Sequence, residues 1–361
     1  MAENKDLKLM SGGTVILLLL IAAGAVGAFL RLTQGLGATT GLNDSYPWGL
    51  WIAFDVMAGV ALAAGGFTIT AAVYIFGMKK YKPIVKPAIL TAFIGYLMVM
   101  LGLFLDIGKP TSFHHVIYMW QPASVLFEVA WCVLLYSAVL FFENISKNKA
   151  VILPLVIAGI TLSFGHQSSL GGLFLLSQSK LSPLYWSTWM NHLFFLSAIA
   201  AGLAMVSIES IVSHKVFKKE QNREILEGLA RGTAIALAVY LAARFIDLGR
   251  NGSLGLILTG GKASVLFIIE IVLFTIMPML LLFLPTVRQS VDNILACQIA
   301  VITGIILNRF SVVLLTQAGQ GGSYFPTFVE FAVTVGIISL AIFLYRFAVV
   351  TWPMLTHAEA D

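Results

Sequence analysis

Charged residues are scarce in this sequence: Asp, Glu, Lys and Arg make up only 11% of its 361 residues. An ordinary soluble domain has about 25% charged residues, so this chain has too few to cover a surface that faces water. Its hydrophobic content of 59% and its mean hydropathy of +0.92 agree with that conclusion. The same composition excludes disordered, collagen-like and coiled-coil classes. We therefore expect a protein that crosses a membrane many times.

Metal-ligating residues are also few. The two cysteines, Cys132 and Cys297, lie singly in apolar runs, so no C-x-x-C pair is present to hold zinc or an iron–sulfur cluster. Of the six histidines, only His166 and His192 lie well inside apolar runs, and their different depths argue against a haem held between them. We expect neither haem nor metal in this chain, so any redox metal would belong to a partner. The 22 basic residues are scattered over short connections and form no nucleic-acid-binding patch.

Long apolar runs are abundant, and about 20 apolar residues suffice to cross the hydrocarbon core as a helix. The sequence contains ten such runs, at 13–33, 48–78, 86–107, 122–143, 150–176, 186–212, 224–247, 263–285, 290–316 and 325–352. The first run is long and lacks a small-residue cleavage site, so we expect it to remain as a helix rather than to be removed as a signal peptide. The predicted fold class is an all-α integral membrane protein of about ten transmembrane helices, with both termini on one side.

Basic residues are distributed unevenly between the two sides of this arrangement. Fourteen of the 22 fall on the side of the termini, five on the opposite side and three inside the runs. Because positive residues favour the cytoplasmic side, the sequence predicts a multi-pass protein of the bacterial cytoplasmic (inner) membrane with both termini cytoplasmic. The periplasmic side carries the longer connections, rich in Gly, Ser, aromatic residues and His, and we expect a protein partner to dock there.

Short motifs recur after about 140 residues. The matched segments are Asp106–Lys109 with Asp247–Arg250, Ala123–Phe127 with Ala263–Phe267, and Ala61–Gly65 with Ala198–Gly202. This offset spans four helices and so preserves orientation, which predicts two parallel-repeat four-helix bundles, helices 2–5 and 6–9, with helices 1 and 10 flanking them. The predicted division is 1–45 for the first helix and its periplasmic loop, 46–178 for the first bundle, 179–318 for the second, and 319–361 for the last helix and cytoplasmic tail.

Several ionisable side chains lie inside the apolar runs, where a charge costs at least about 2.5–3.5 kcal/mol. Asp55, Glu128 and His166 fall in the first predicted bundle, where the sequence places no cation at a matching depth, so a functional role is favoured. A quinone ring needs hydrogen-bonding groups at its carbonyl oxygens, groups that pass two protons, and an apolar crevice with aromatic walls. Aromatic side chains near the same side, which could equally form an interfacial belt, are Trp48, Trp51, Tyr118, Trp120 and Trp131.

The second predicted bundle keeps the polar positions but changes their chemistry. The repeat offset sets His192 against Asp55, Asp247 against Asp106, Glu270 near the counterpart of Glu128, and Arg309 near that of His166. Two structural alternatives stay open. Arg244 and Asp247 are three residues apart on one helical face and can neutralise each other. Arg309 can form a buried pair with Glu270 or with Glu330 of the last helix.

Three segments carry a resemblance to a known family: Trp48–Val56, Gln121–Cys132 and His166–Gly171. They resemble the NrfD/polysulfide-reductase membrane-subunit family, and within it the ten-helix membrane subunits of periplasm-facing nickel–iron uptake hydrogenases (HybB type). The resemblance is strongest over residues 46–212. It implies a haem-free, quinone-binding subunit that exchanges electrons with a periplasmic four-cluster ferredoxin-like iron–sulfur protein. In this branch that protein connects to the small and large subunits of a nickel–iron hydrogenase.

The resemblance also implies roles for particular residues. The family's quinone pocket would fall on Asp55, Glu128, His166, Gln167 and Trp51. Candidates for proton transfer are Asp106, His192, Glu270, Arg309 and Glu330. We therefore expect a membrane anchor that passes electrons to menaquinone or another quinone and does not itself split hydrogen. The alternatives are a subunit of a polysulfide, sulfite or cytochrome-linked complex, and a secondary transporter or proton channel.

Overall fold

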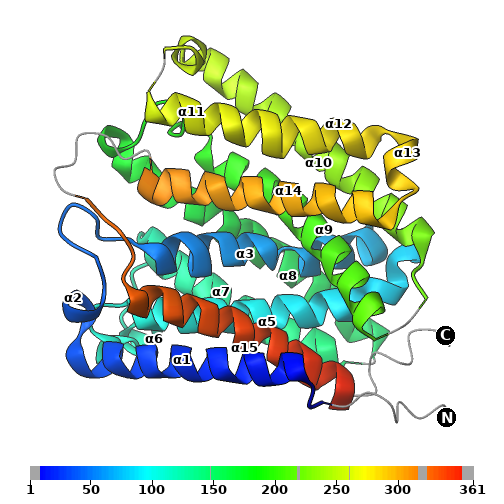
Figure 1. Ribbon diagram of the computed structural model, residues 1–361, viewed down its shortest axis with the longest axis horizontal. Helices are drawn as coiled ribbons and strands as arrows, with labels where there is room; N and C mark the ends of the chain where they lie inside the picture. The colour runs from blue at the N-terminus through cyan, green and yellow to red at the C-terminus, as the bar shows by residue number, and fades with distance from the viewer. Residues whose placement is uncertain (1–8, 147, 218–219, 260, 316–322, 352–361) are drawn as a thin grey trace.

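The computed structural model describes residues 9–146, 148–217, 220–259, 261–315 and 323–351. Ten of its helices are long and apolar enough to cross a membrane, and they lie side by side (Figure 1). Within the described ranges the only extended pairing is an isolated bridge between Asn43 and Tyr46. The predicted fold class, an all-helical chain with ten membrane-spanning helices, is confirmed.

Six of the spans are single long helices or nearly so, and four are built from several pieces. The spans are α1 (Gly12–Gln34); η1 (Trp51–Ala58), α3 (Gly59–Leu62), α4 (Gly65–Thr70) and η2 (Ala71–Ile75); α5 (Lys82–Asp106); α7 (Val125–Ile145); α8 (Lys149–Gly172) with η5 (Leu173–Lys180); α9 (Met190–Val216); α10 (Arg223–Arg250); α11 (Lys262–Ile268), η7 (Ile269–Ile276) and α12 (Met277–Phe283); α14 (Val291–Phe310) with η8 (Ser311–Leu315); and α15 (Phe328–Thr351). The short helices between them are α2 (Leu36–Thr39), η3 (Lys79–Tyr81), η4 (Pro110–Ser112), α6 (His115–Tyr118), η6 (Leu254–Ile257) and α13 (Pro285–Arg288).

The predicted run boundaries agree with these helices to within a few residues. The main difference is in the fifth span, where a 3₁₀ segment continues the helix to Lys180. The predicted ends at residues 316 and 352 lie outside the described residues. Ser124 illustrates why an apolar helix begins where it does, because its hydroxyl accepts a hydrogen bond from the backbone N–H of Phe127 at the start of α7.

The spans pack as two groups of four. In the first, α5 contacts span 2 and α7, α7 contacts α8, and α8 returns to span 2 through α4 and η2. The second group has the same cyclic order, because α9 contacts α10, α10 contacts α12, α12 contacts α14, and α14 returns to α9. The division of the chain at about residue 178 stays a prediction, and so does the duplication itself.

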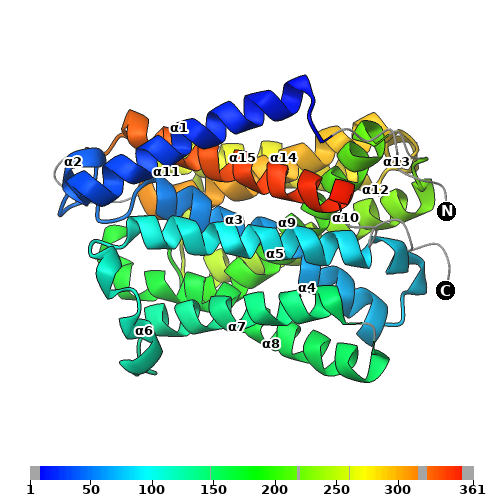
Figure 2. The ribbon, with the colours of Figure 1, turned by 90° about the horizontal axis from the view of Figure 1, so that it is seen from below.

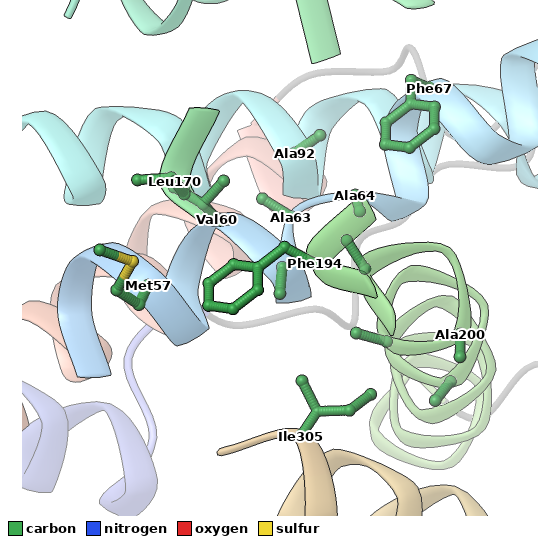
Figure 3. Packing of buried hydrophobic residues seen from close by; sticks show 14 of the residues in the cluster. Met57, Val60, Ala63, Ala64, Phe67, Ala92, Leu170, Phe194, Ala200 and Ile305 are labelled. Carbon is green, nitrogen blue, oxygen red and sulfur yellow. The ribbon is translucent and has the colours of Figure 1, made fainter. Parts of the chain in front are cut away.

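The two groups meet along α9, where small side chains allow close approach. Figure 3 shows Phe194 of α9 among the apolar side chains of span 2, which include Met57 and Val60. Further along, a Cβ atom at Gly202 would lie 2.5 Å from the backbone nitrogen of Gly65. Because the two backbones are in contact here, a larger side chain at Gly65 or Gly202 would force the bundles apart. The two glycines are also matched positions of the predicted repeat.

The first and last spans form a separate pair on one side of the molecule (Figure 2). α1 packs mainly against α15, and α15 packs in turn against α5 and η1. The crossing is tight because a Cβ atom at Gly24 would lie 2.7 Å from the Cα atom of Gly336. Without a hydrophobic force between helices in lipid, such close contact between small residues is what drives association.

Replacing Gly24 by alanine should therefore destabilise the protein. Alanine is about 1 kcal/mol more favourable than glycine within a helix, so a loss would report the contact with Gly336 and not helix propensity. We expect a lower midpoint of thermal unfolding for the detergent-purified Gly24→Ala protein. The matched control is Gly12→Ala in the same helix, where the added Cβ meets no atom within 4 Å. Equal midpoints for both variants would contradict the packing argument.

The two ends of the bundle can be distinguished by their contacts. The backbone carbonyl of Leu9 accepts a hydrogen bond from Arg346 Nε at 3.3 Å, so the beginning and end of the described chain lie at the same end, here called the inner end. At the opposite, outer end, Arg31 of α1 lies against the end of α5. That the inner end faces the cytoplasm stays a prediction from the distribution of basic residues.

Candidate functional site

His166 of α8 lies in the interior of the first group of spans and has no exposed surface. Its Nδ1 is 2.6 Å from the backbone carbonyl oxygen of Leu162, an atom that can only accept, so Nδ1 carries the proton. The lone pair on Nε2 then accepts a hydrogen bond from the hydroxyl group of Tyr96 on α5. Both imidazole nitrogens are therefore engaged in hydrogen bonds.

Two tyrosine rings enclose this imidazole. The centroids of Tyr96 and Tyr136 are 4.8 Å apart in an edge-to-face contact, and they lie 5.2 and 5.7 Å from that of His166. The next residue, Gln167, is 1% exposed and donates from Nε2 to the carbonyl oxygen of Val60 at 2.9 Å. We call Tyr96, Tyr136, His166 and Gln167 the His166 cluster. It joins α5, α7 and α8 to span 2 at mid-depth in the bundle.

Glu128 lies beside the residue that precedes His166, but its side chain faces outward. It is exposed, in the first turn of α7, and its Oε1 would lie 3.9 Å from a Cβ atom at Gly165, the residue before His166. Trp120 and Trp131 stack nearby with ring centroids 5.1 Å apart. The structure thus brings His166 and Gln167 together, with Glu128 on the adjoining outer surface of α7 and α8 beside aromatic side chains.

Trp51 and Asp55 point away from the His166 cluster, towards α5 and α15. Asp55 is 5% exposed, and its Oδ2 accepts a hydrogen bond of 2.7 Å from the hydroxyl group of Thr334 on α15. Its Oδ1 has no hydrogen-bond partner among the described residues. Trp51 is 1% exposed and donates from Nε1 to the carbonyl oxygen of Glu330 at 3.2 Å. The five predicted quinone-binding residues therefore occupy two regions of the structure.

A polar cluster closes the outer end beside Asp55. Arg31 of α1 is 2% exposed and donates to the carbonyl oxygens of Leu105 and Ile107, at 2.8 and 2.6 Å, where α5 ends at Asp106. Arg31 lies close enough to Asp106 for their charges to interact. Arg31 is one of the five basic residues that the distribution of charge assigns to the periplasmic side. Its position within run 13–33 was the signal that it is buried.

Glu330, also predicted to transfer protons, is fully engaged by three donors. Its carboxylate accepts hydrogen bonds from the backbone N–H groups of Gly41 and Thr327, at 2.8 and 2.9 Å, and from the hydroxyl group of Tyr324. Burial and this carboxylate raise the pKa of Tyr324, which keeps its hydroxyl group protonated as a donor. Glu330 therefore anchors the start of α15 to the loop that follows α1.

Two other predicted residues meet in the second group of spans. Asn308 Nδ2 donates to Glu270 Oε1 at 2.9 Å, and Arg309 Nη1 donates to Asn308 Oδ1 at 2.8 Å, so Asn308 links the two charged groups. Arg309 Nη2 also donates to Ser197 Oγ at 2.8 Å, and its guanidinium lies 3.8 Å from the ring centroid of Phe194. Two small cavities flank this network, each with room for about one water molecule.

Of the remaining residues that the sequence singled out, Arg244 lines the same small cavity as Asn308 and Arg309, whereas His192 and Asp247 do not line it. His192 is exposed at the start of α9, with its ring centroid 6.3 Å from that of Trp189. Arg244 donates to the carbonyl oxygen of Leu184 at 2.6 Å, whereas Asp247 Oδ1 accepts from Asn251 at 3.0 Å. Each of these two charged groups thus has a partner of its own.

The two histidines inside the predicted spans, His166 and His192, have different surroundings. Both ring nitrogens of His166 are engaged in hydrogen bonds, and His192 is exposed on another helix. Across the part of the chain that the structure describes, no three His, Cys, Asp or Glu side chains are grouped as metal ligands would be. His357 lies outside the described residues.

The sequence of this chain is similar to those of several known proteins. The profile of the family described as polysulphide reductase, NrfD matches residues 38–320. A protein of Nitratidesulfovibrio vulgaris (strain Hildenborough) is 36% identical over 98% of this chain and 96% of its own length. The probable Ni/Fe-hydrogenase 2 b-type cytochrome subunit of Escherichia coli K12 is 29% identical over 90% of this chain and 88% of its own. The menaquinone reductase integral membrane subunit of N. vulgaris is 28% identical, covering 88% and 85%.

Proposed function

Because this chain belongs to the NrfD family of polysulphide reductases, we propose that it is the quinone-reactive membrane subunit of a respiratory hydrogenase complex. Relatives that align over most of its length are named as a probable Ni/Fe-hydrogenase 2 b-type cytochrome subunit and as the integral membrane subunit of a menaquinone reductase. In this proposal a periplasmic four-cluster iron–sulfur protein delivers electrons from the hydrogenase small and large subunits. The chain reduces menaquinone or another quinone and does not split hydrogen.

The position of Glu128 is the observation that supports a quinone site most directly. An exposed carboxyl group on a transmembrane helix is costly in lipid. Here it lies beside stacked tryptophan rings and beside Gly165, the residue that precedes the buried His166. A carboxyl group in its acid form donates a hydrogen bond to a quinone carbonyl oxygen and can pass its proton there. We propose that the quinone ring lies against α7 and α8 at this point, within the bundle of residues 46–178.

The other members of the predicted site act around this position. Gln167 fixes α8 to span 2 through Val60, which holds the His166 cluster in place. His166 has no free nitrogen, so its contribution passes through the Tyr96 hydroxyl group. Asp55 and Trp51 line the side of span 2 that faces α15 and would act on protons or on helix position rather than on the ring.

The test uses the tagged chain purified together with the redox subunits that it binds. We expect iron–sulfur proteins to co-purify and hydrogen to reduce a soluble menaquinone analogue. A transporter or proton channel would bring down no iron–sulfur protein, and a reduced-minus-oxidised haem band from the purified chain would overturn the haem-free assignment. Activity with polysulfide or sulfite in place of hydrogen would assign the chain to another complex of the same family.

A further inference from the structure

Several buried polar groups of the first bundle have no hydrogen-bond partner among the described residues, and three of them lie on α7 and α8 on the inner side of His166. These three are the hydroxyl groups of Tyr136 and Ser163 and the Oε1 atom of Glu143. The side chains are 1%, 0% and 7% exposed, respectively. An unsatisfied buried polar group costs about 1–3 kcal/mol, and such groups call for water or a functional role. No role is predicted from the sequence for these residues or for Tyr96.

These groups follow one another along the bundle interior. Ser163 precedes His166 by about one turn of α8 and lies beside the hydroxyl groups of Tyr96 and Tyr136. Glu143 follows Tyr136 by seven residues on the same face of α7, about 10 Å nearer the inner end. It lies close enough to Tyr136 and to Tyr74, in the last turn of span 2, for their charges to interact.

We propose that Glu143, Tyr136, Ser163 and Tyr96 form a route that carries protons from the inner face of the membrane to His166. Hydroxyl and carboxyl groups both donate and accept hydrogen bonds, so they can pass a proton along with water in the gaps. Glu143 stands at the inner entrance because α7 ends two residues later. The route rests on the proposed function, since it supplies the protons that quinone reduction consumes.

The chemical balance of this step is simple. One quinone takes two electrons from the iron–sulfur partner and two protons, which enter at Glu143 and pass from His166 to the carboxyl group of Glu128 and then to the quinone oxygens, and becomes quinol. The electrons would arrive from the outer side and the protons from the inner side, so each quinone reduced would move two charges across the membrane. Uptake through the exposed Glu128 from the outer side would instead move none.

In the experiment, the purified complex is reconstituted into liposomes. Membrane-impermeant dyes that accept electrons from the hydrogenase identify the complexes whose hydrogenase faces outward, and only these are assayed. A pH indicator is trapped inside, a potential-sensitive dye is added, and hydrogen and a menaquinone analogue start the reaction. We expect proton uptake from the inner-end side and a membrane potential that uncoupler collapses. Glu143→Gln and Tyr136→Phe should lower quinone reduction by about tenfold or more, while dye-linked hydrogen oxidation stays unchanged.

Glu209→Gln is the matched control. Glu209 is another carboxylate towards the inner end, but it is half-buried and lies on α9, where Tyr345 donates to it at 2.7 Å. We expect this variant to reduce quinone at the unaltered rate. Protons taken from the outer side, or full activity of Glu143→Gln, would overturn the route while leaving the proposed function intact. An unaltered complex that cannot reduce quinone would instead refute the proposed function.

Discussion

Glu128→Gln and His166→Ala should each abolish hydrogen-dependent quinone reduction while leaving dye-linked hydrogen oxidation by the complex intact. General acid–base groups contribute about 100- to 10,000-fold to rates, and both variants remove such a group from the proposed quinone site. Glu128 is exposed, so its replacement leaves the bundle packing unchanged. His166 is fully buried and its loss frees the hydroxyl group of Tyr96.

The measurement is the rate of quinone reduction and, separately, of dye reduction by the same preparation. Tyr96→Phe serves as the companion to His166→Ala, since it keeps the ring and removes only the hydroxyl group that reaches Nε2. Co-purification of the iron–sulfur subunits shows that each variant is assembled. Unaltered quinone reduction by both Glu128→Gln and His166→Ala would refute the assignment of the site to α7 and α8.

Arg309→Met should strongly lower the stability of the second bundle. Removing one partner from a buried charge network costs about 3–5 kcal/mol because it leaves the other charge uncompensated. Here Glu270 and Asn308 would lose the guanidinium that joins them to Ser197. Combining Arg309→Met with Glu270→Gln removes both charges, and we expect it to recover most of the lost stability.

Thermal unfolding of the detergent-purified protein measures both effects, and equal midpoints for the single and double variants would show that the two charges do not interact. Quinone reduction by the double variant then separates the two interpretations of this pair. A buried structural pair predicts that the double variant remains active. A role in proton transfer predicts that it is stable but inactive.

The spans and the depth of the polar residues were accessible from the sequence because the bilayer imposes them. A helix of about 20 residues must be apolar, so each charge within a run is conspicuous, and Glu270 and Arg309 were singled out in this way before the structure brought them together through Asn308. Which neighbours these groups meet depends on helix rotation. A nearly uniform apolar surface encodes rotation weakly, which is why Asp55 was grouped with His166 although it faces α15.

Four residues were missed for related reasons. Tyr96 and Tyr136 look like any tyrosine of a membrane protein until their rings are found around His166. Arg31 looks like a loop cation because it lies near the end of its run, yet its guanidinium binds the carbonyl groups at the end of α5. Glu143 lies at the boundary of its run, where headgroup contact is the ordinary explanation for a carboxylate.

The pairing of α1 with α15 has a consequence for biosynthesis. The ribosome releases the first helix hundreds of residues before it makes the last, so during elongation Gly24 faces lipid with its partner Gly336 not yet made. Arg31 can meet the end of α5 earlier, once the third span has been inserted. That guanidinium would hold the first helix beside the growing protein until termination, and a chain truncated before α15 should leave this helix loosely attached and open to membrane proteases.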